Sequence, residues 1–165
     1  MTKKPKTKGF TKAVRTIQGT MTPFLCILDL GRQFDQYEDG QELNGYTLAF
    51  CVGALGREIV AELESAGFHD RGSLIQWKQT DGTKDAAEKA GSLLQDAIFV
   101  IGDLTAILDE LSHSSDNWEP GMHSAVGVMT YTMALRAARQ VERAAELLGD
   151  GPGMGFNDRS FDEPK

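Results

Sequence analysis

A long apolar stripe is the feature that most constrains how this chain can fold. Between residues 90 and 111 the apolar positions recur in alternating steps of four and three, at Ala90, Leu94, Ala97, Ile101, Leu104, Leu108 and Leu111. This is the spacing of α-helices that pack side by side at a shallow angle, whereas a half-buried strand alternates every two residues. Asp85 and Glu88 stand three residues apart just before the stripe, as in a helix-capping box. We therefore predict a helix over residues 85–112 with the stripe in the core.

Three further segments show helical periodicity, over residues 22–37, 46–66 and 120–148. The second is followed by Gly67 and the third begins at Pro120, and both residue types are typical of those helix ends. The four spans cover more than half of the chain, compared with about a third in an average globular protein. No pair of segments alternates as paired strands do, so the sequence predicts an all-α fold.

The lengths of the links predict how these helices are arranged. The links that follow the predicted helices 22–37 and 85–112 are short. Short links favour an antiparallel helical bundle of about four helices, built as two helical hairpins. These hairpins span residues 22–66 and 85–148, and a connector at 67–84 joins them. The second hairpin should turn at residues 114–119, with Trp118 folded back over its end.

The two ends of the chain differ in composition from the middle. The first fifteen residues hold six basic side chains and no acidic one, although the 165-residue chain carries a net charge of −7. The other end begins with a glycine-rich run. We therefore expect a basic N-terminal arm at residues 1–20, a single helical domain at 21–149 and a flexible glycine-rich tail at 150–165. Because the first fifteen residues show no apolar periodicity, they should contribute little to stability.

Small residues are frequent inside the predicted helices. Each glycine there costs roughly 1 kcal/mol relative to alanine, so close contact between helices is the expected compensation. The glycines concerned are Gly31, Gly53, Gly56, Gly91, Gly102 and Gly127. The two cysteines, Cys26 and Cys51, stand in apolar stretches without Cys-x-x-Cys spacing, so we expect buried free thiols.

Several classes of function lack their sequence signals. No Gly-x-Ser-x-Gly motif, phosphate-binding loop or dinucleotide-binding glycine motif occurs, so we expect neither an enzyme nor a bound cofactor. The most apolar stretch, residues 97–108, is interrupted by Gly102 and Asp103. It is also shorter than the roughly 20 residues that span a bilayer. We therefore expect a cytoplasmic protein that makes no contact with a membrane.

Acidic and histidine side chains around the second hairpin's turn form a candidate metal site. Glu110 and His113 have the Glu-x-x-His spacing of di-iron helical bundles, although those sites need two copies and this chain has one. Asp116, Glu119 and His123 follow and could add oxygen and nitrogen ligands. A polar helix–helix turn gives the same pattern. A metal-binding bundle is therefore the alternative to a role in protein interaction.

Charged residues and surplus apolar surface favour interaction with other proteins. The predicted helices are of unequal length, so part of the apolar surface should stay uncovered within one chain. We therefore expect a non-enzymatic helical interaction or regulatory module that forms a homo-oligomer or binds another protein. The candidate interaction residues are the basic side chains of the arm and the last helix: Lys3, Lys4, Lys6, Lys8, Arg136, Arg139 and Arg143.

Nucleic acid is not an expected partner of the helical body. The body is acidic and repels a phosphate backbone, so only the basic arm could contact nucleic acid. Within the second hairpin, Asp96 should lie level with Arg136 and Arg139 and form surface ion pairs with them. An acidic decoy that occupies the nucleic-acid-binding surface of another protein is a further alternative.

Overall fold

The computed structural model describes residues 8–37, 44–68, 81–149 and 155–156, and helices account for nearly all of them. No described residue lies in a strand, and the prediction of an all-α fold is confirmed. The elements in chain order are α1 (Lys8–Gln18), α2 (Met21–Asp35), α3 (Gly45–Leu63), the π-helical turn η1 (Glu64–Phe68), α4 (Asp81–Ser112), the 3-10 turn η3 (Ser115–Asn117) and α5 (Pro120–Leu148).

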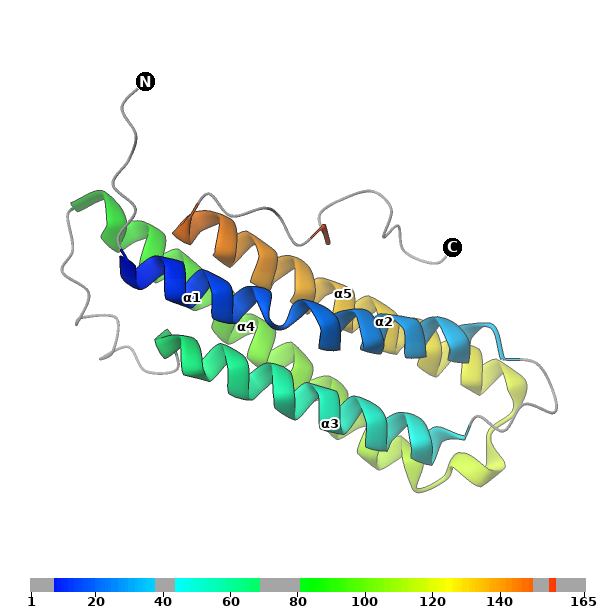
Figure 1. Cartoon of the computed structure of the whole chain (residues 1–165). Coiled ribbons are helices and arrows are strands. Elements are labelled where there is room, and N and C mark those ends of the chain that lie inside the picture. The colour runs from blue at the N-terminus through cyan, green and yellow to red at the C-terminus, as the bar shows by residue number, and fades with distance from the viewer. Residues whose placement is uncertain (1–7, 38–43, 69–80, 150–154, 157–165) are drawn as a thin grey trace.

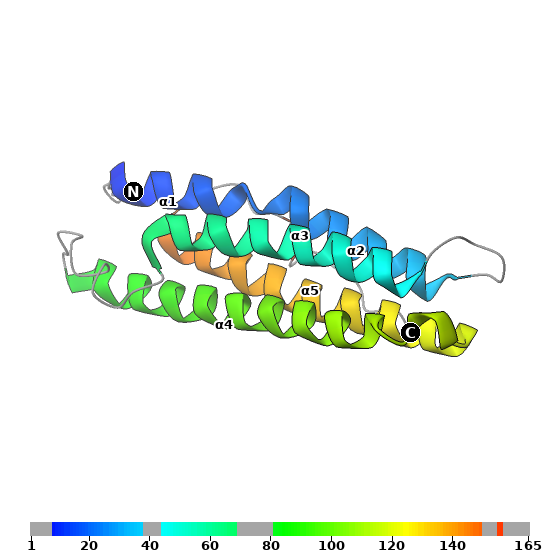
Figure 2. The same ribbon diagram turned by 90° about the horizontal axis from the view of Figure 1, so that it is seen from below.

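The helices form an antiparallel bundle of four rods (Figure 1). Helices α1 and α2 follow each other along the first rod, which is broken at Gly19 and Thr20. Helix α3 runs back beside α2, and α4 and α5 form the second hairpin. Helix α5 makes the most extensive contacts, with α4 and α2, while α3 packs mainly on α4. The bundle therefore has two layers, one made by α1, α2 and α5 and the other by α3 and α4 (Figure 2).

The helix boundaries agree closely with the sequence pattern except at the start of α4. Helix α5 has the predicted bounds, and Asn44 caps α3 by accepting the backbone N–H of Thr47 at 2.8 Å. Helix α4 begins at Asp81, so Asp85 lies inside the helix and the predicted capping box is wrong. Most of the predicted connector, residues 69–80, lies outside the described residues.

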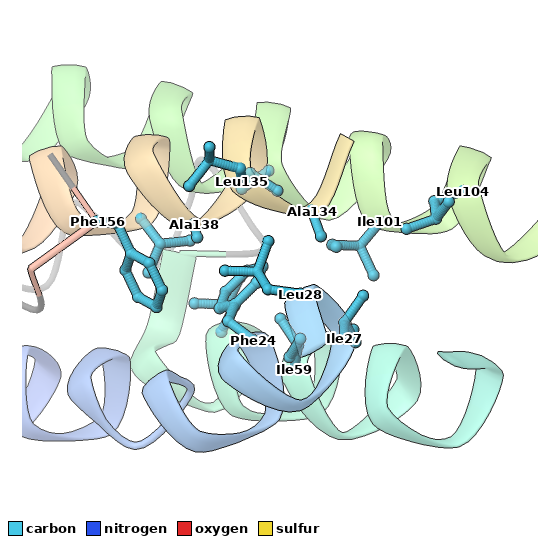
Figure 3. Packing of buried hydrophobic residues seen from close by; sticks show 14 of the residues in the cluster. Phe24, Ile27, Leu28, Ile59, Ile101, Leu104, Ala134, Leu135, Ala138 and Phe156 are labelled. Carbon is cyan, nitrogen blue, oxygen red and sulfur yellow. The ribbon is translucent and has the colours of Figure 1, made fainter. Parts of the chain in front are cut away.

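The core contains the predicted stripe of α4. Ile101, Leu104 and Leu108 are at most 1% exposed, which confirms that this face of the helix points inward. Helix α5 supplies the opposite wall largely with alanines, and Figure 3 shows Ala134 and Ala138 among the larger side chains of the other helices. Small side chains let α5 approach α2 and α4 at the same time.

Two glycines allow α2 and α5 to cross with their backbones in contact. A Cβ atom added to Gly31 would lie 2.9 Å from the backbone nitrogen of Tyr131 and 3.0 Å from the carbonyl oxygen of Gly127. A Cβ added to Gly127 would lie 2.6 Å from the carbonyl oxygen of Gly31. The expected close contact is therefore confirmed here, and also at Gly56, where an added Cβ would lie 2.8 Å from Thr105 Cγ2.

The N-terminal segment is not an unstructured arm throughout. Residues 8–18 form α1, in which Ala13, Val14 and Ile17 are buried against the bundle. The three apolar side chains are spaced to lie on one face of a helix, but they are embedded among basic residues, which obscures the pattern. Residues 1–7 lie outside the described part of the chain. Helix α1 also packs against α5, which reduces the overhang predicted for that helix.

Truncating Ile17 should therefore destabilise the whole protein. Because Ile17 is fully buried, Ile17→Ala should lower the free energy of unfolding by about 2–4 kcal/mol in a urea titration. Arg15→Ala, at an exposed position of the same helix, is the control and should change it by less than about 0.5 kcal/mol. Equal effects of the two substitutions would mean that α1 does not pack on the bundle.

The predicted tail is likewise attached at one point. Phe156 is fully buried, so the expectation of a flexible segment is wrong for Gly155 and Phe156. Residues 150–154 and 157–165 lie outside the described part of the chain.

Helix α4 meets one criterion for a membrane span. Residues Asp85–Ser112 contain a stretch of 18 residues that is long and apolar enough by composition, although Gly102 and Asp103 interrupt the apolar run. The expectation that no segment reaches this length is therefore wrong. A core helix of a soluble protein passes the same test. The inner stripe of α4 is packed in the core, although only 33% of the apolar stretch is buried, and the structure is compatible with a soluble protein.

Candidate interaction surface

Three large aromatic side chains stand out from the bundle. Tyr46 and Phe50 on α3 are 63% and 73% exposed, and Phe99 on α4 is 63% exposed. Tyr46 and Phe50 are four residues apart and therefore lie on one side of α3, opposite its buried positions Leu48 and Val52. Phe99 occupies the corresponding outward side of α4. Buried aromatic side chains contribute heavily to stability and binding, so their exposure here needs an explanation.

These aromatic residues belong to one layer of the bundle. Helices α3 and α4 lie side by side, and their outward sides are turned away from α2 and α5 (Figures 1 and 2). Exposed small residues of α4 lie next to Phe99 along the helix, at Gly102 and Ala106. We call the outward sides of these two helices, which carry Tyr46 and Phe50 on α3 and Phe99, Gly102 and Ala106 on α4, the α3/α4 face.

Gly102 differs from the glycines of the core. A Cβ added there would meet no described atom of the chain within 4 Å, so contact between helices of the same chain does not account for this glycine. The prediction that every helical glycine compensates its cost by internal packing is thus wrong at Gly102. A glycine on an outward helix surface leaves room for the backbone of another helix to approach closely.

Helix α4 also carries acidic but no basic side chains over most of its length. From residue 90 to its end at residue 112 the helix has no basic residue, and its acidic side chains are all exposed: Asp96, Asp103, Asp109 and Glu110. Asp96, Asp103 and Glu110 recur every seven residues and therefore share a stripe beside Phe99. Arg57, exposed on α3, brings a basic group to the same layer.

The predicted basic interaction residues fall elsewhere. Arg136 and Arg143 are exposed on α5, in the other layer of the bundle. Arg139 is half-buried, and its Nε donates a hydrogen bond of 2.8 Å to the carbonyl oxygen of Phe156, so it holds the chain's own backbone. The predicted ion pairs of Asp96 with Arg136 and Arg139 stay predictions. Lys3, Lys4 and Lys6 lie outside the described residues, as does the side chain of Lys8.

The candidate metal ligands are not brought together. His113 is exposed, and its Nδ1 lies 2.7 Å from the carbonyl oxygen of Asp109. His123 is buried, and its ring stacks on Tyr37 with the centroids 4.1 Å apart. Across the described ranges, no three His, Cys, Asp or Glu side chains are grouped as a metal site. Glu110, Asp116 and Glu119 are each exposed at the end of the second hairpin.

Trp118 closes this end of the bundle, as predicted. Its ring packs on the core, and it lies so near the start of α3 that a Cβ added to Gly45 would be 2.5 Å from Trp118 Cη2. A hollow of about 520 Å³ adjoins it, lined by Ser114, Asn117, Trp118, Glu119, Gly121, Met122 and Ala125. The hydroxyl of Ser114 donates to the carbonyl oxygen of Leu111 at 3.1 Å.

The thiols are more accessible than expected. Cys26 is exposed and Cys51 is half-buried, so the prediction of two buried thiols is wrong. Cys26 lies on the outer side of α2, away from the buried residues Phe24, Ile27 and Leu28. An apolar neighbourhood in sequence does not place a residue on the inner side of a helix.

Comparison with known proteins adds no relative: no family model, no curated protein and no solved structure matches this chain.

The exposed aromatic residues were not singled out as sites by the sequence pattern. A helical projection could have found Tyr46 and Phe50, because both fall opposite the apolar stripe of α3.

Proposed function

We propose that this protein is a cytoplasmic, non-enzymatic helical interaction module that binds a second copy of itself through the α3/α4 face. The observation that carries the proposal is the exposure of Tyr46, Phe50 and Phe99, each above 60%, on one layer of the bundle. Aromatic side chains are enriched among the residues that dominate binding energy at protein interfaces. Exposed apolar surface of this kind typically marks an interaction site.

The dimensions of the face suit a dimer contact. Helix α3 has 19 residues, and at ~1.5 Å per residue it is roughly 28 Å long. Two adjacent helices of about 10 Å diameter give a surface roughly 20 Å wide, or about 560 Å² in projection. A stable interface buries about 800 Å² of accessible surface per partner, which a ridged helical surface of this projected area approaches.

Charge favours a two-fold arrangement. If α3 of one copy lies over α4 of the other, Arg57 faces the acidic stripe that contains Asp96 and Asp103. The open position at Gly102 then receives the partner helix. Such a contact is the same from both sides, as a two-fold dimer requires.

The proposal predicts concentration-dependent association that the aromatic residues control. Sedimentation velocity between about 1 and 100 µM should show a monomer–dimer equilibrium for the unaltered chain. Phe50→Ser combined with Phe99→Ser should weaken dimerisation by at least about 30-fold, the factor expected when interface residues worth ~2 kcal/mol are lost.

Leu147→Ser is the matched control for this experiment. Leu147 is an apolar side chain of α5 that is 37% exposed, and it lies outside the α3/α4 face. Its substitution should leave the dimerisation constant unchanged. A chain that remains monomeric throughout this range, or a control as disruptive as the double variant, contradicts the proposal.

The acidic stripe of α4 favours one second candidate, the binding of a basic protein surface. Four exposed acids without an intervening base are suited to such a partner, and an acidic decoy would act in this way. Binding of this kind should weaken steeply as salt rises, whereas dimerisation through Phe50 and Phe99, with Arg57 as its one basic contact, should weaken much less. Measuring the salt dependence of dimerisation and of binding to a basic protein therefore separates the two candidates.

A further inference from the structure

A short segment beyond α5 returns to the bundle and is held there by its side chain. Phe156 is fully buried, and its ring meets that of Phe24 edge to face, with the centroids 6.0 Å apart. Figure 3 shows the Phe156 ring beside Ala138 and Phe24, with Leu28 and Leu135 in the same cluster. The slot that receives Phe156 therefore lies between α2 and α5.

The backbone of the same segment is held by two side chains of α5. The carboxylate oxygen Oε1 of Glu142 accepts the N–H of Gly155 at 2.6 Å, and Nε of Arg139 donates to the carbonyl oxygen of Phe156 at 2.8 Å. Glu142 and Arg139 are three residues apart and therefore project from the same side of the helix. Glu142 is only 2% exposed, whereas Gly155 is exposed, so the bond between them lies at the edge of the buried region.

Glycine is required at the first position of this segment. Gly155 has a φ of +86°, a backbone conformation that residues with a side chain rarely adopt. The arrangement thus selects a glycine, an amide hydrogen, a carbonyl oxygen and an aromatic ring in a fixed order. Charge-assisted bonds to the main chain together with an aromatic anchor are a general means of recognising a peptide.

We propose that the slot between α2 and α5 is a peptide-binding site for a segment in which glycine precedes an aromatic residue, and that Gly155–Phe156 occupies it as a releasable latch. The occupant that the site admits in trans is a Gly–Phe segment of a partner protein. The chain's own segment competes at the high effective concentration of a tethered group, which can reach millimolar order. A free peptide therefore binds well only when the latch is removed.

The test uses the full-length Phe156→Ala variant and a fluorescent peptide with the sequence of residues 151–160. We expect saturable binding to the variant and at least about tenfold weaker binding to the unaltered chain, in which the latch competes. A peptide with alanine in place of its phenylalanine is the control and should not bind. Absence of saturable binding to the variant up to about 1 mM peptide, or equal binding of the control peptide, overturns the proposal.

A second measurement covers the case in which Phe156→Ala fails to fold. Hydrogen exchange of the Gly155 amide in the unaltered chain reports opening of the latch directly, because this N–H is bonded to Glu142. A releasable latch should exchange at least about 100-fold faster than the buried amides of α5, through local opening. If the Gly155 amide exchanges at the same rate as the buried amides of α5, the segment opens only on global unfolding. That result would refute the latch.

Discussion

Gly127→Ala is expected to remove most of the stability of this protein. A Cβ atom at Gly127 would run directly into the backbone nitrogen of Asp35 and would lie 2.6 Å from the carbonyl oxygen of Gly31 and 2.7 Å from the carbonyl carbon of Phe34. These are backbone atoms of α2, so no side chain can rotate away. The two helices must separate, which loosens the close contact between α2 and α5. We expect the free energy of unfolding to fall by about 4 kcal/mol or more, a large share of the 5–15 kcal/mol typical of a domain.

Gly102→Ala is the matched control for that experiment. The same atom is added to a helix, but at Gly102 it meets nothing within 4 Å. Alanine should therefore stabilise the monomer by about 0.5–1 kcal/mol, the ordinary difference in helix propensity. Urea denaturation of both variants measures the contrast. A loss below about 1 kcal/mol for Gly127→Ala would show that α2 and α5 are not in backbone contact.

Leu104→Ala should have the next largest effect. Leu104 is fully buried in the stripe of α4, so truncation removes apolar contacts and leaves a cavity. The expected loss in free energy of unfolding is about 2–5 kcal/mol. Ile107, on the same helix, is 39% exposed, and Ile107→Ala should cost less than about 1 kcal/mol. Similar losses for the two variants would place the stripe on the wrong side of the helix.

Local periodicity was sufficient to predict the long helices. The bounds of α5 follow from Pro120 and Gly149, and the stripe of α4 identifies Leu104 as a core residue. Helix α1 was missed because Val14 and Ile17 make up a short apolar face among many lysines. Such a face becomes helical when a partner surface covers it, and here that surface is α5.

Contacts between distant segments were less accessible from the sequence. The burial of Phe156 depends on the slot between α2 and α5, and no pattern in the sequence around Phe156 predicts this burial. Arg139 was grouped with Arg136 and Arg143 by spacing, although its partner is a carbonyl oxygen 17 positions away. His123 was considered as a ligand because its neighbours in sequence are polar, whereas its neighbours in space are aromatic.

The location of the dimer contact can be measured directly. A nitroxide label on Glu58→Cys, an exposed position of α3, is attached in a chain with Cys26→Ser and Cys51→Ser. This labelled chain is mixed with an unlabelled chain enriched in ¹⁵N, so that only contacts between copies broaden the amide signals. We expect broadening at residues 46–54 of α3 and 99–106 of α4. Broadening centred on α1, α2 or α5, or none at all at concentrations up to about 1 mM, would contradict it.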